Sequence, residues 1–93
     1  MLTVVGGPSQ PARYPLVGAE TLIGRESYCT IQLPGDGTVS RRHAIVRNDG
    51  RQITVMDAGS SHGTYLNGQR VTAPAVVRRG MVLQVEQTLL RFE

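Results

Sequence analysis

Turn-forming residues interrupt this chain about every eight to twelve residues, and this spacing constrains its fold more than any other feature. Short apolar runs such as LTVV, TIQL and MVLQVE lie between the turns. No run shows the period of an amphipathic helix. About ten or eleven such strands without a helix are typical of a two-sheet antiparallel sandwich. We therefore predict an all-β fold.

Two hairpins are the most clearly marked elements. The run AIVRNDGRQITVMD, residues 44–57, turns at Asn48-Asp49-Gly50, where glycine can supply a positive φ. Asn67-Gly68 is the strongest two-residue hairpin signal and separates two further short runs. Alternation along the first hairpin predicts the residues that face the core, which are Ile45, Ile53 and Val55.

Length and cysteine content restrict the domain organisation and the compartment. The chain has 93 residues, which suffice for one modest core, so we expect a single domain over residues 1–93. Its one cysteine, Cys29, cannot form an internal disulfide and fits a reducing compartment as a small buried residue. The start, MLTVVGG, lacks the features of a signal peptide or membrane span. These features predict a cytoplasmic domain without a membrane partner.

The charge pattern argues against nucleic acid as a partner. The formal charge is +3, and all ten basic residues are arginine, the residue suited to fork-like recognition of phosphate and carboxylate. These arginines are spread along the chain, and no recognition helix is visible. Aromatic residues make up only 4%, too few for stacking platforms that bind single strands. The basic charge is therefore better suited to a small anionic group.

Three segments between the predicted strands are polar in a similar way. They are residues 24–27 (GRES), 38–43 (TVSRRH) and 59–64 (GSSHGT). Together they offer guanidinium and hydroxyl donors, imidazole rings and backbone N–H groups left open by glycine. This inventory suits a phosphate held by charge-assisted hydrogen bonds. Because loops gather at the ends of a sandwich, the segments can meet at one end.

These elements resemble a known family. G-R, then S-R-x-H, then S-x-x-G-T-x-x-N-G, in this order within an all-β chain, is similar to the forkhead-associated (FHA) domain, and the resemblance covers Leu2 to Phe92. It implies an eleven-stranded, FHA/SMAD-like sandwich that binds phosphothreonine peptides across loops at one end. The implied function is phosphorylation-dependent protein–protein interaction in Ser/Thr kinase signalling, with a phosphothreonine-containing protein or peptide as the partner.

The resemblance also implies two sets of site residues. The set expected to contact the phosphopeptide is Arg25, Ser40, Arg41, Ser61 and His62. The set expected to shape the loops is Gly24, His43, Gly63, Thr64, Asn67 and Gly68. Within the first set, strand-like alternation would direct at most one of Arg41 and Arg42 toward a given ligand, and Arg41 is favoured.

His62 departs from the family's commoner pattern. That pattern, S-x-N-G-T, has asparagine at this position, where it holds the backbone of the bound peptide. A neutral imidazole can both donate and accept, as an amide does, but with a different reach and angle. A protonated imidazole only donates. The preference for residues that flank the phosphothreonine therefore depends on His62.

Catalytic and metal-binding alternatives are weaker. Ser40 or Ser61, with His43 or His62 and Asp57, contains the residue types of a hydrolase triad. No G-x-S-x-G elbow accompanies them, so we do not expect an enzyme. Two histidines and one cysteine have no metal-ligand spacing, and neither a metal nor another cofactor is expected. A phosphate-independent interaction through a sandwich face remains as the alternative function. The oligomeric state cannot be read from the sequence.

Overall fold

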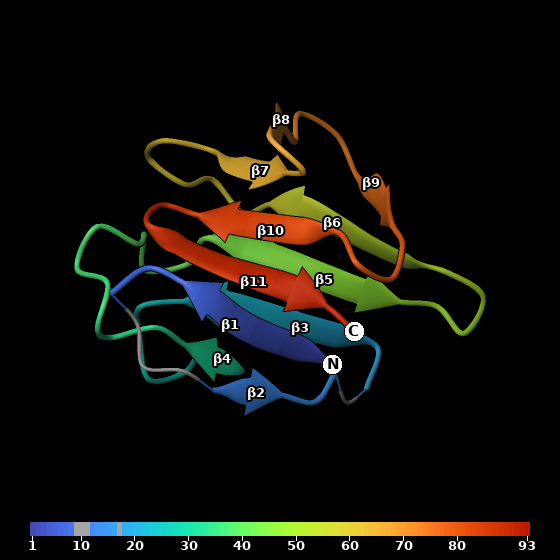
Figure 1. Ribbon diagram of the computed structural model, residues 1–93, viewed down its shortest axis with the longest axis horizontal. Helices are drawn as coiled ribbons and strands as arrows, with labels where there is room; N and C mark the ends of the chain where they lie inside the picture. Colours follow the sequence, from blue (N-terminus) through green and yellow to red (C-terminus); the bar gives the residue numbers. More distant parts are fainter. Residues whose placement is uncertain (9–11, 17) are drawn as a thin grey trace.

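Figure 1 shows the computed structural model of the chain, which describes residues 1–8, 12–16 and 18–93. The described residues form a β-sandwich of two sheets, as predicted. The strands are β1 (Leu2–Gly6), β2 (Arg13–Tyr14), β3 (Glu20–Gly24), β4 (Ile31–Gln32), β5 (Ala44–Asn48), β6 (Ile53–Asp57), β7 (Thr64–Leu66), β8 (Gln69–Arg70), β9 (Ala75–Val77), β10 (Val82–Val85) and β11 (Thr88–Phe92). Within these residues no helix has the length and apolar character needed to cross a membrane.

One sheet has the strand order β2-β1-β11-β10-β7-β8, and the other has the order β4-β3-β5-β6-β9. The pairs between described strands are antiparallel except for β3 and β4, which run parallel. This pair departs from the antiparallel prediction because residues 25–30 fold back along the sheet. Strand β4 consequently runs in the same direction as β3, with Ile31 beside Ile23. The loop that makes this return also carries part of the candidate site.

The two sheets enclose one hydrophobic cluster, to which nearly every strand contributes through its alternate residues. In β11, for example, Leu90 and Phe92 are buried while Arg91 between them is exposed. Fully buried members of the cluster include Leu2, Ile23, Leu83, Val85 and Leu90. This core holds the strands in place. The strands in turn position the loops at their ends.

The predicted inward face of β5 was wrong, whereas Ile53 and Val55 of β6 pack against or within the central cluster as predicted. Ala44 and Val46 belong to the central cluster, and Ile45 between them points to the outer face of the sheet. There Ile45 lies between Leu22 and Met56 of the neighbouring strands, which leaves it only 8% exposed. Because three consecutive residues of β5 are buried, hydrophobicity alone could not identify the inward face.

The loops are unequally distributed between the two ends of the sandwich. The β4–β5, β6–β7 and β10–β11 connections lie at one end, and the β5–β6 turn lies at the other (Figure 1). The first end therefore brings together segments that are far apart in the sequence. The second end presents the hairpin turn at Asn48-Asp49-Gly50, and Gly50 has the expected positive φ of 90°.

Candidate functional site

An open pocket of about 590 Å³ lies where the β3–β4, β4–β5 and β6–β7 loops meet. Every residue expected to contact a phosphopeptide contributes to its wall. The residues that line it are Arg25, Tyr28, Gly37, Thr38, Val39, Ser40, Arg41, Arg42, Ala58, Gly59, Ser61 and His62. The three polar segments of the sequence thus converge on one surface, which combines cationic, hydroxyl and backbone donors.

Arg25 is placed by a close approach between β3 and the β4–β5 loop. Its backbone N–H donates to the carbonyl oxygen of Ser40 (3.1 Å). Gly24 precedes it, and a Cβ atom at Gly24 would lie 2.2 Å from the carbonyl oxygen of Arg41. Only glycine permits this contact without a shift of the backbone. The half-buried Arg25 side chain reaches back toward the Gly37 carbonyl, with Nη1 at 3.5 Å.

His43 connects the β4–β5 loop to the β6–β7 loop. It is fully buried, and its Nδ1 accepts a hydrogen bond from the backbone N–H of Ser40 (3.2 Å). Nε2 must then carry the ring proton, and it donates to the carbonyl oxygen of Gly63 (2.9 Å). A second tie joins the same loops directly, since the Ser61 N–H donates to Oγ of Ser40 (3.0 Å). Both serines are therefore held at a fixed separation.

Asp57 organises the β6–β7 loop from inside. Its carboxylate accepts hydrogen bonds from the backbone N–H groups of Gly59 and Ser60 (both 3.0 Å) and from Oγ1 of Thr64 (2.7 Å). The Ser60 hydroxyl also donates to it and accepts from the N–H of Gly63 (2.9 Å). Burial alone would raise the pKa of Asp57, but these hydrogen bonds outweigh it and lower the pKa below its usual value.

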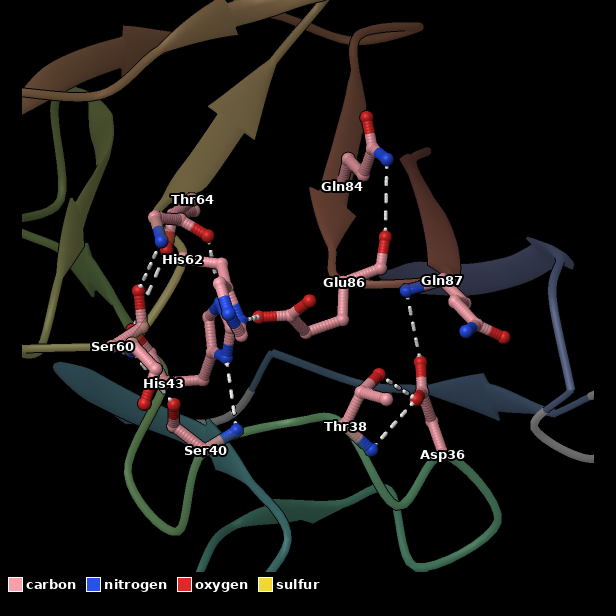
Figure 2. A network of polar contacts seen from close by, with 12 residues as sticks. Asp36, Thr38, Ser40, His43, Ser60, His62, Thr64, Gln84, Glu86 and Gln87 are labelled. Carbon is pink, nitrogen blue, oxygen red and sulfur yellow. Dashed lines mark hydrogen bonds and ion pairs between the residues drawn. The ribbon is translucent and has the colours of Figure 1, made fainter.

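Asp36 performs the corresponding task for the β4–β5 loop, over a longer range. It is 1% exposed and accepts hydrogen bonds from both the N–H (3.2 Å) and the hydroxyl of Thr38. Its other oxygen accepts from the N–H of Gln87 (3.0 Å) and from Oγ1 of Thr88 (2.9 Å), which ties the loop to the β10–β11 turn (Figure 2). Burial again opposes the charge, and the hydrogen bonds nevertheless lower the pKa of Asp36.

His62 has a partner that the sequence did not reveal. Its Nδ1 lies 2.9 Å from Oε1 of Glu86 in the β10–β11 turn (Figure 2). An ionised carboxylate only accepts, so Nδ1 carries a proton in this pair. The remaining ring nitrogen, Nε2, is then an acceptor when the ring is neutral and a donor when it is protonated. The side chain is 73% exposed, so Nε2 can be reached from the pocket.

Arg41 and Arg42 both line the pocket, although strand-like alternation predicted that at most one of them would face a given ligand. Which of the two contacts a ligand stays a prediction, with Arg41 favoured. Residues 40–43 form an irregular loop that precedes β5, so strand alternation does not govern them. Nε of Arg41 lies 3.7 Å from Oε1 of Glu26 in an exposed ion pair. Such a pair contributes little to stability, and it leaves most guanidinium donors open to a ligand.

Cys29 lies beneath the loops as a small buried residue, as expected. Its Sγ donates to the carbonyl oxygen of Arg41 (3.2 Å), and burial raises the pKa of the thiol. A raised pKa disfavours the reactive thiolate, which fits the interpretation of Cys29 as a small buried residue. No group of three His, Cys, Asp or Glu side chains among the described residues is arranged to hold a metal ion.

Asn67 and Gly68 lie outside the pocket and make the β7–β8 turn. Both have positive φ, 49° and 82°, as a two-residue hairpin requires. Oδ1 of Asn67 accepts the backbone N–H of Val82 (2.8 Å), which fastens the turn to β10. These two residues therefore shape a neighbouring hairpin and do not contribute to the pocket wall.

Several residues of the site were missed by sequence reasoning. They are Tyr28, Asp36 and Glu86. Sequence reasoning favoured Arg41 over Arg42, and it considered Asp57 only as a member of a hydrolase triad. An aspartate two or three residues before the groups it binds is a local signal, which applies to Asp36 with Thr38 and to Asp57 with Ser60. The bonds of Asp36 and Glu86 across the fold carry no such local signal.

The fold and the site together define an all-β sandwich that presents a cationic, hydroxyl-lined pocket at one end. Residues 21–86 match the family model of the FHA domain. The chain belongs to the FHA domain family, as the sequence motifs indicated.

Two relatives of the chain are named as regulatory proteins. The chain is 39% identical over 92 residues to the glycogen accumulation regulator GarA of Mycolicibacterium smegmatis, covering 99% of this chain and 57% of that protein. It is 38% identical over 92 residues to the oxoglutarate dehydrogenase inhibitor of Corynebacterium glutamicum, covering 99% of this chain and 63% of that protein. The chain thus spans somewhat more than half the length of these relatives. Neither relative is described as an enzyme, in agreement with the sequence prediction.

Solved structures show the same architecture. One, from an analysis of phosphothreonine-dependent FHA domain interactions, has a TM-score of 0.84 at 29% identity and covers 97% of this chain and 90% of its own. Mycobacterium tuberculosis EmbR in complex with a low-affinity phosphopeptide has a TM-score of 0.85 at 25% identity, covering 99% of this chain and 24% of its own. The present chain is an FHA domain, a module of phosphothreonine-dependent interaction.

Proposed function

We propose that the pocket binds the phosphothreonine of an extended peptide, with Arg25, Ser40 and Ser61 as its main phosphate contacts. The observation that carries this assignment is their convergence from three different loops on one open pocket. Ser40 and Ser61 are joined by a hydrogen bond, and Arg25 is joined to the backbone of Ser40. A phosphate between them would meet groups whose positions are already fixed, so binding would cost little conformational entropy.

The direction of each hydrogen bond fits this role. Oγ of Ser40 accepts the N–H of Ser61, which leaves its own O–H available to a phosphate oxygen. The guanidinium groups of Arg25 and Arg41 supply charge-assisted donors. A phosphothreonine carries about −1.5 to −2 charges, and each such bond contributes about 1.5–3 kcal/mol net. A few of these bonds account for a micromolar complex, about −8 kcal/mol, after association costs.

His62 takes the position at which the peptide backbone would be held. Glu86 fixes its ring with Nδ1 directed away from the pocket, so Nε2 is the atom offered to the peptide. In the neutral ring, this atom accepts a backbone N–H, which is the opposite role to that of an amide NH₂ group. The flanking-residue preference of this domain therefore differs from that of domains with asparagine at this position.

The partner we propose is a phosphothreonine-containing protein in a Ser/Thr kinase pathway. The domain would bind it in the cytoplasm. The regulator and inhibitor functions of the two bacterial relatives support an interaction module that acts on other proteins. The single free cysteine supports a reducing compartment. The domain would recognise this partner by its phosphothreonine.

Calorimetric titration with a phosphothreonine peptide tests the proposal. Arg25→Ala and Ser40→Ala should each abolish measurable binding. Arg51→Ala, in the β5–β6 turn between Asn48 and Ile53 and outside the pocket, should leave affinity unchanged. Far-ultraviolet circular dichroism should show the same fold in all three variants. Unchanged affinity in both site variants, or equal affinity for the unphosphorylated peptide, would overturn the assignment.

A phosphate-independent partner is the second candidate, because the outer face of the β4-β3-β5-β6-β9 sheet carries apolar side chains. Leu22, Ile45 and Met56 lie side by side there, and Val76, on the adjacent strand β9, is 46% exposed. A partner bound to this face would tolerate Arg25→Ala and would not be displaced by a free phosphothreonine peptide. If that peptide displaces the partner, the partner binds in the phosphate pocket and not on this face.

A further inference from the structure

Tyr28 is the most exposed large apolar side chain of the described residues, with 62% of its surface accessible. It lies on the β3–β4 loop and lines the same pocket as Arg25 and Ser40. Phe92 is buried and Tyr65 is half-buried, so an aromatic ring left in solvent is unusual within this chain. Because the ring lines the pocket and is open to solvent, its face is available to a ligand bound there.

The backbone on either side of Tyr28 is firmly held. The N–H of Cys29 donates to the carbonyl oxygen of Glu26 (3.0 Å), which closes a tight turn around Tyr28. Cys29 itself is only 7% exposed and is fastened by its Sγ to the carbonyl of Arg41. The ring is therefore mounted on a rigid turn, and a tyrosine has only two side-chain torsions to restrict on binding.

The charges around Tyr28 restrict what it can contact. Arg25, Arg41 and Arg42 line the same pocket, and the nearby Glu26 is already paired with Arg41. A basic peptide side chain placed here would be repelled by these guanidinium groups. An apolar side chain meets no such penalty and removes both its own surface and part of the ring from water. The pocket rim at Tyr28 thus favours an apolar residue of the ligand.

We propose that Tyr28 is a specificity-determining residue that packs against an apolar side chain flanking the phosphothreonine of the bound peptide. This inference rests on the proposed function, because it places a peptide in the same pocket. It adds the chemical class of a flanking residue, which none of the phosphate contacts defines. The phosphate switches binding on, and Tyr28 then discriminates among phosphorylated sequences.

The test uses phosphothreonine peptides that differ at one flanking position at a time. Each of the three positions on either side of the phosphothreonine carries leucine, serine or lysine in turn, and affinities are measured by fluorescence anisotropy. The wild-type domain should prefer leucine over serine at one position by roughly fivefold or more, with lysine weakest there. Tyr28→Ala should lose this preference, Tyr28→Phe should keep it, and the serine peptide should bind wild type and Tyr28→Ala within about twofold.

Val5→Ala is the matched control, because Val5 is an exposed apolar residue that does not line the pocket. It should retain the full leucine preference. Equal weakening of all peptides by Tyr28→Ala would show that the ring contacts the phosphothreonine itself, and an unchanged preference would show that it contacts nothing selective. Either result overturns the inference and leaves the phosphate site intact. Absence of binding by every phosphopeptide would instead defeat the proposed function, and the inference with it.

Discussion

Two loops at opposite ends of the sandwich are each built around an aspartate, and they differ in what the aspartate reaches. In the β5–β6 turn, Asp49 accepts the N–H groups of Arg51 and Gln52 (both 2.9 Å), so its bonds stay within the turn. In the β4–β5 loop, Asp36 binds Thr38 and also Gln87 of the β10–β11 turn, 51 residues away. Hydrogen bonds lower the pKa of both carboxyl groups.

The difference separates a residue that turns the chain from one that assembles a site. Asp49 is exposed and serves only its own hairpin. Asp36 is buried and holds the loop that carries Ser40 and Arg41 against another part of the fold. A phosphate pocket built from distant segments needs such a tie, because otherwise ordering the loops would cost free energy at each binding event.

The largest effect is expected for Asp36→Asn. The amide keeps the shape but replaces one acceptor oxygen with an NH₂ group that faces the existing donors. The loss of several bonds to a buried carboxylate should lower the free energy of unfolding by about 2–3 kcal/mol. It should also weaken phosphopeptide binding at least tenfold, because the β4–β5 loop is released. Urea unfolding and calorimetry on the same samples measure the two effects.

Gly24→Ala is expected to have the next largest effect, and Gly50→Ala serves as its counterpart at the other end. The added methyl at Gly24 would overlap the Arg41 carbonyl, which should cost about 1–3 kcal/mol and weaken peptide binding. Gly50 has open space around it but a φ of 90°, so alanine there should cost about 1 kcal/mol through backbone strain. Binding by Gly50→Ala should be unchanged. Weakened binding in Gly50→Ala would contradict the separation of the two ends.

Acid should lower stability by protonating the carboxylates of Asp36 and Asp57. The pKa values of Asp36 and Asp57 are lower in the folded chain, so their stabilising contribution is complete above about pH 4, the unfolded value. It is lost as the pH falls through the folded-state pKa. Urea unfolding between pH 7 and pH 3 should therefore show falling stability at the acid end. Asp36→Asn should reduce that slope, and an unaltered slope would mean that Asp36 is not ionised in the fold.

The smallest effect is expected for Asp49→Asn. Asparagine retains an oxygen that can accept from the turn, and it is itself common in turns. Thermal unfolding should shift less than in any variant above, and phosphopeptide affinity should not change. A binding loss comparable to that of Asp36→Asn would show that the two loops are energetically connected across the sandwich.

The same contrast explains how far the sequence could predict the structure. Local signals predicted the strands, the turns at Asn48-Asp49-Gly50 and Asn67-Gly68, and the three polar segments that line the pocket. The inward face of β5 could not be predicted, because its first three residues are all apolar and buried on one face or the other. The parallel return of β4 was equally hidden, since it depends on the path of a loop.

The site was predictable to the extent that it follows short motifs. Arg25, Ser40 and Ser61 were identified in this way, and all three line the pocket. The long-range partners, Asp36 with Gln87 and His62 with Glu86, were not, because tertiary contacts between distant loops leave no mark in a single sequence.

Nuclear magnetic resonance titration tests the central claim most directly, because backbone amide shifts report on both ends of the sandwich at once. With a phosphothreonine peptide, we predict shifts concentrated in residues 24–28, 37–43 and 59–63, with the β5–β6 turn at residues 48–52 unaffected. The unphosphorylated peptide should leave the spectrum unchanged. Shifts centred on the β5–β6 turn or on the outer face of β5 and β6, or shifts that do not require the phosphate, would contradict the account.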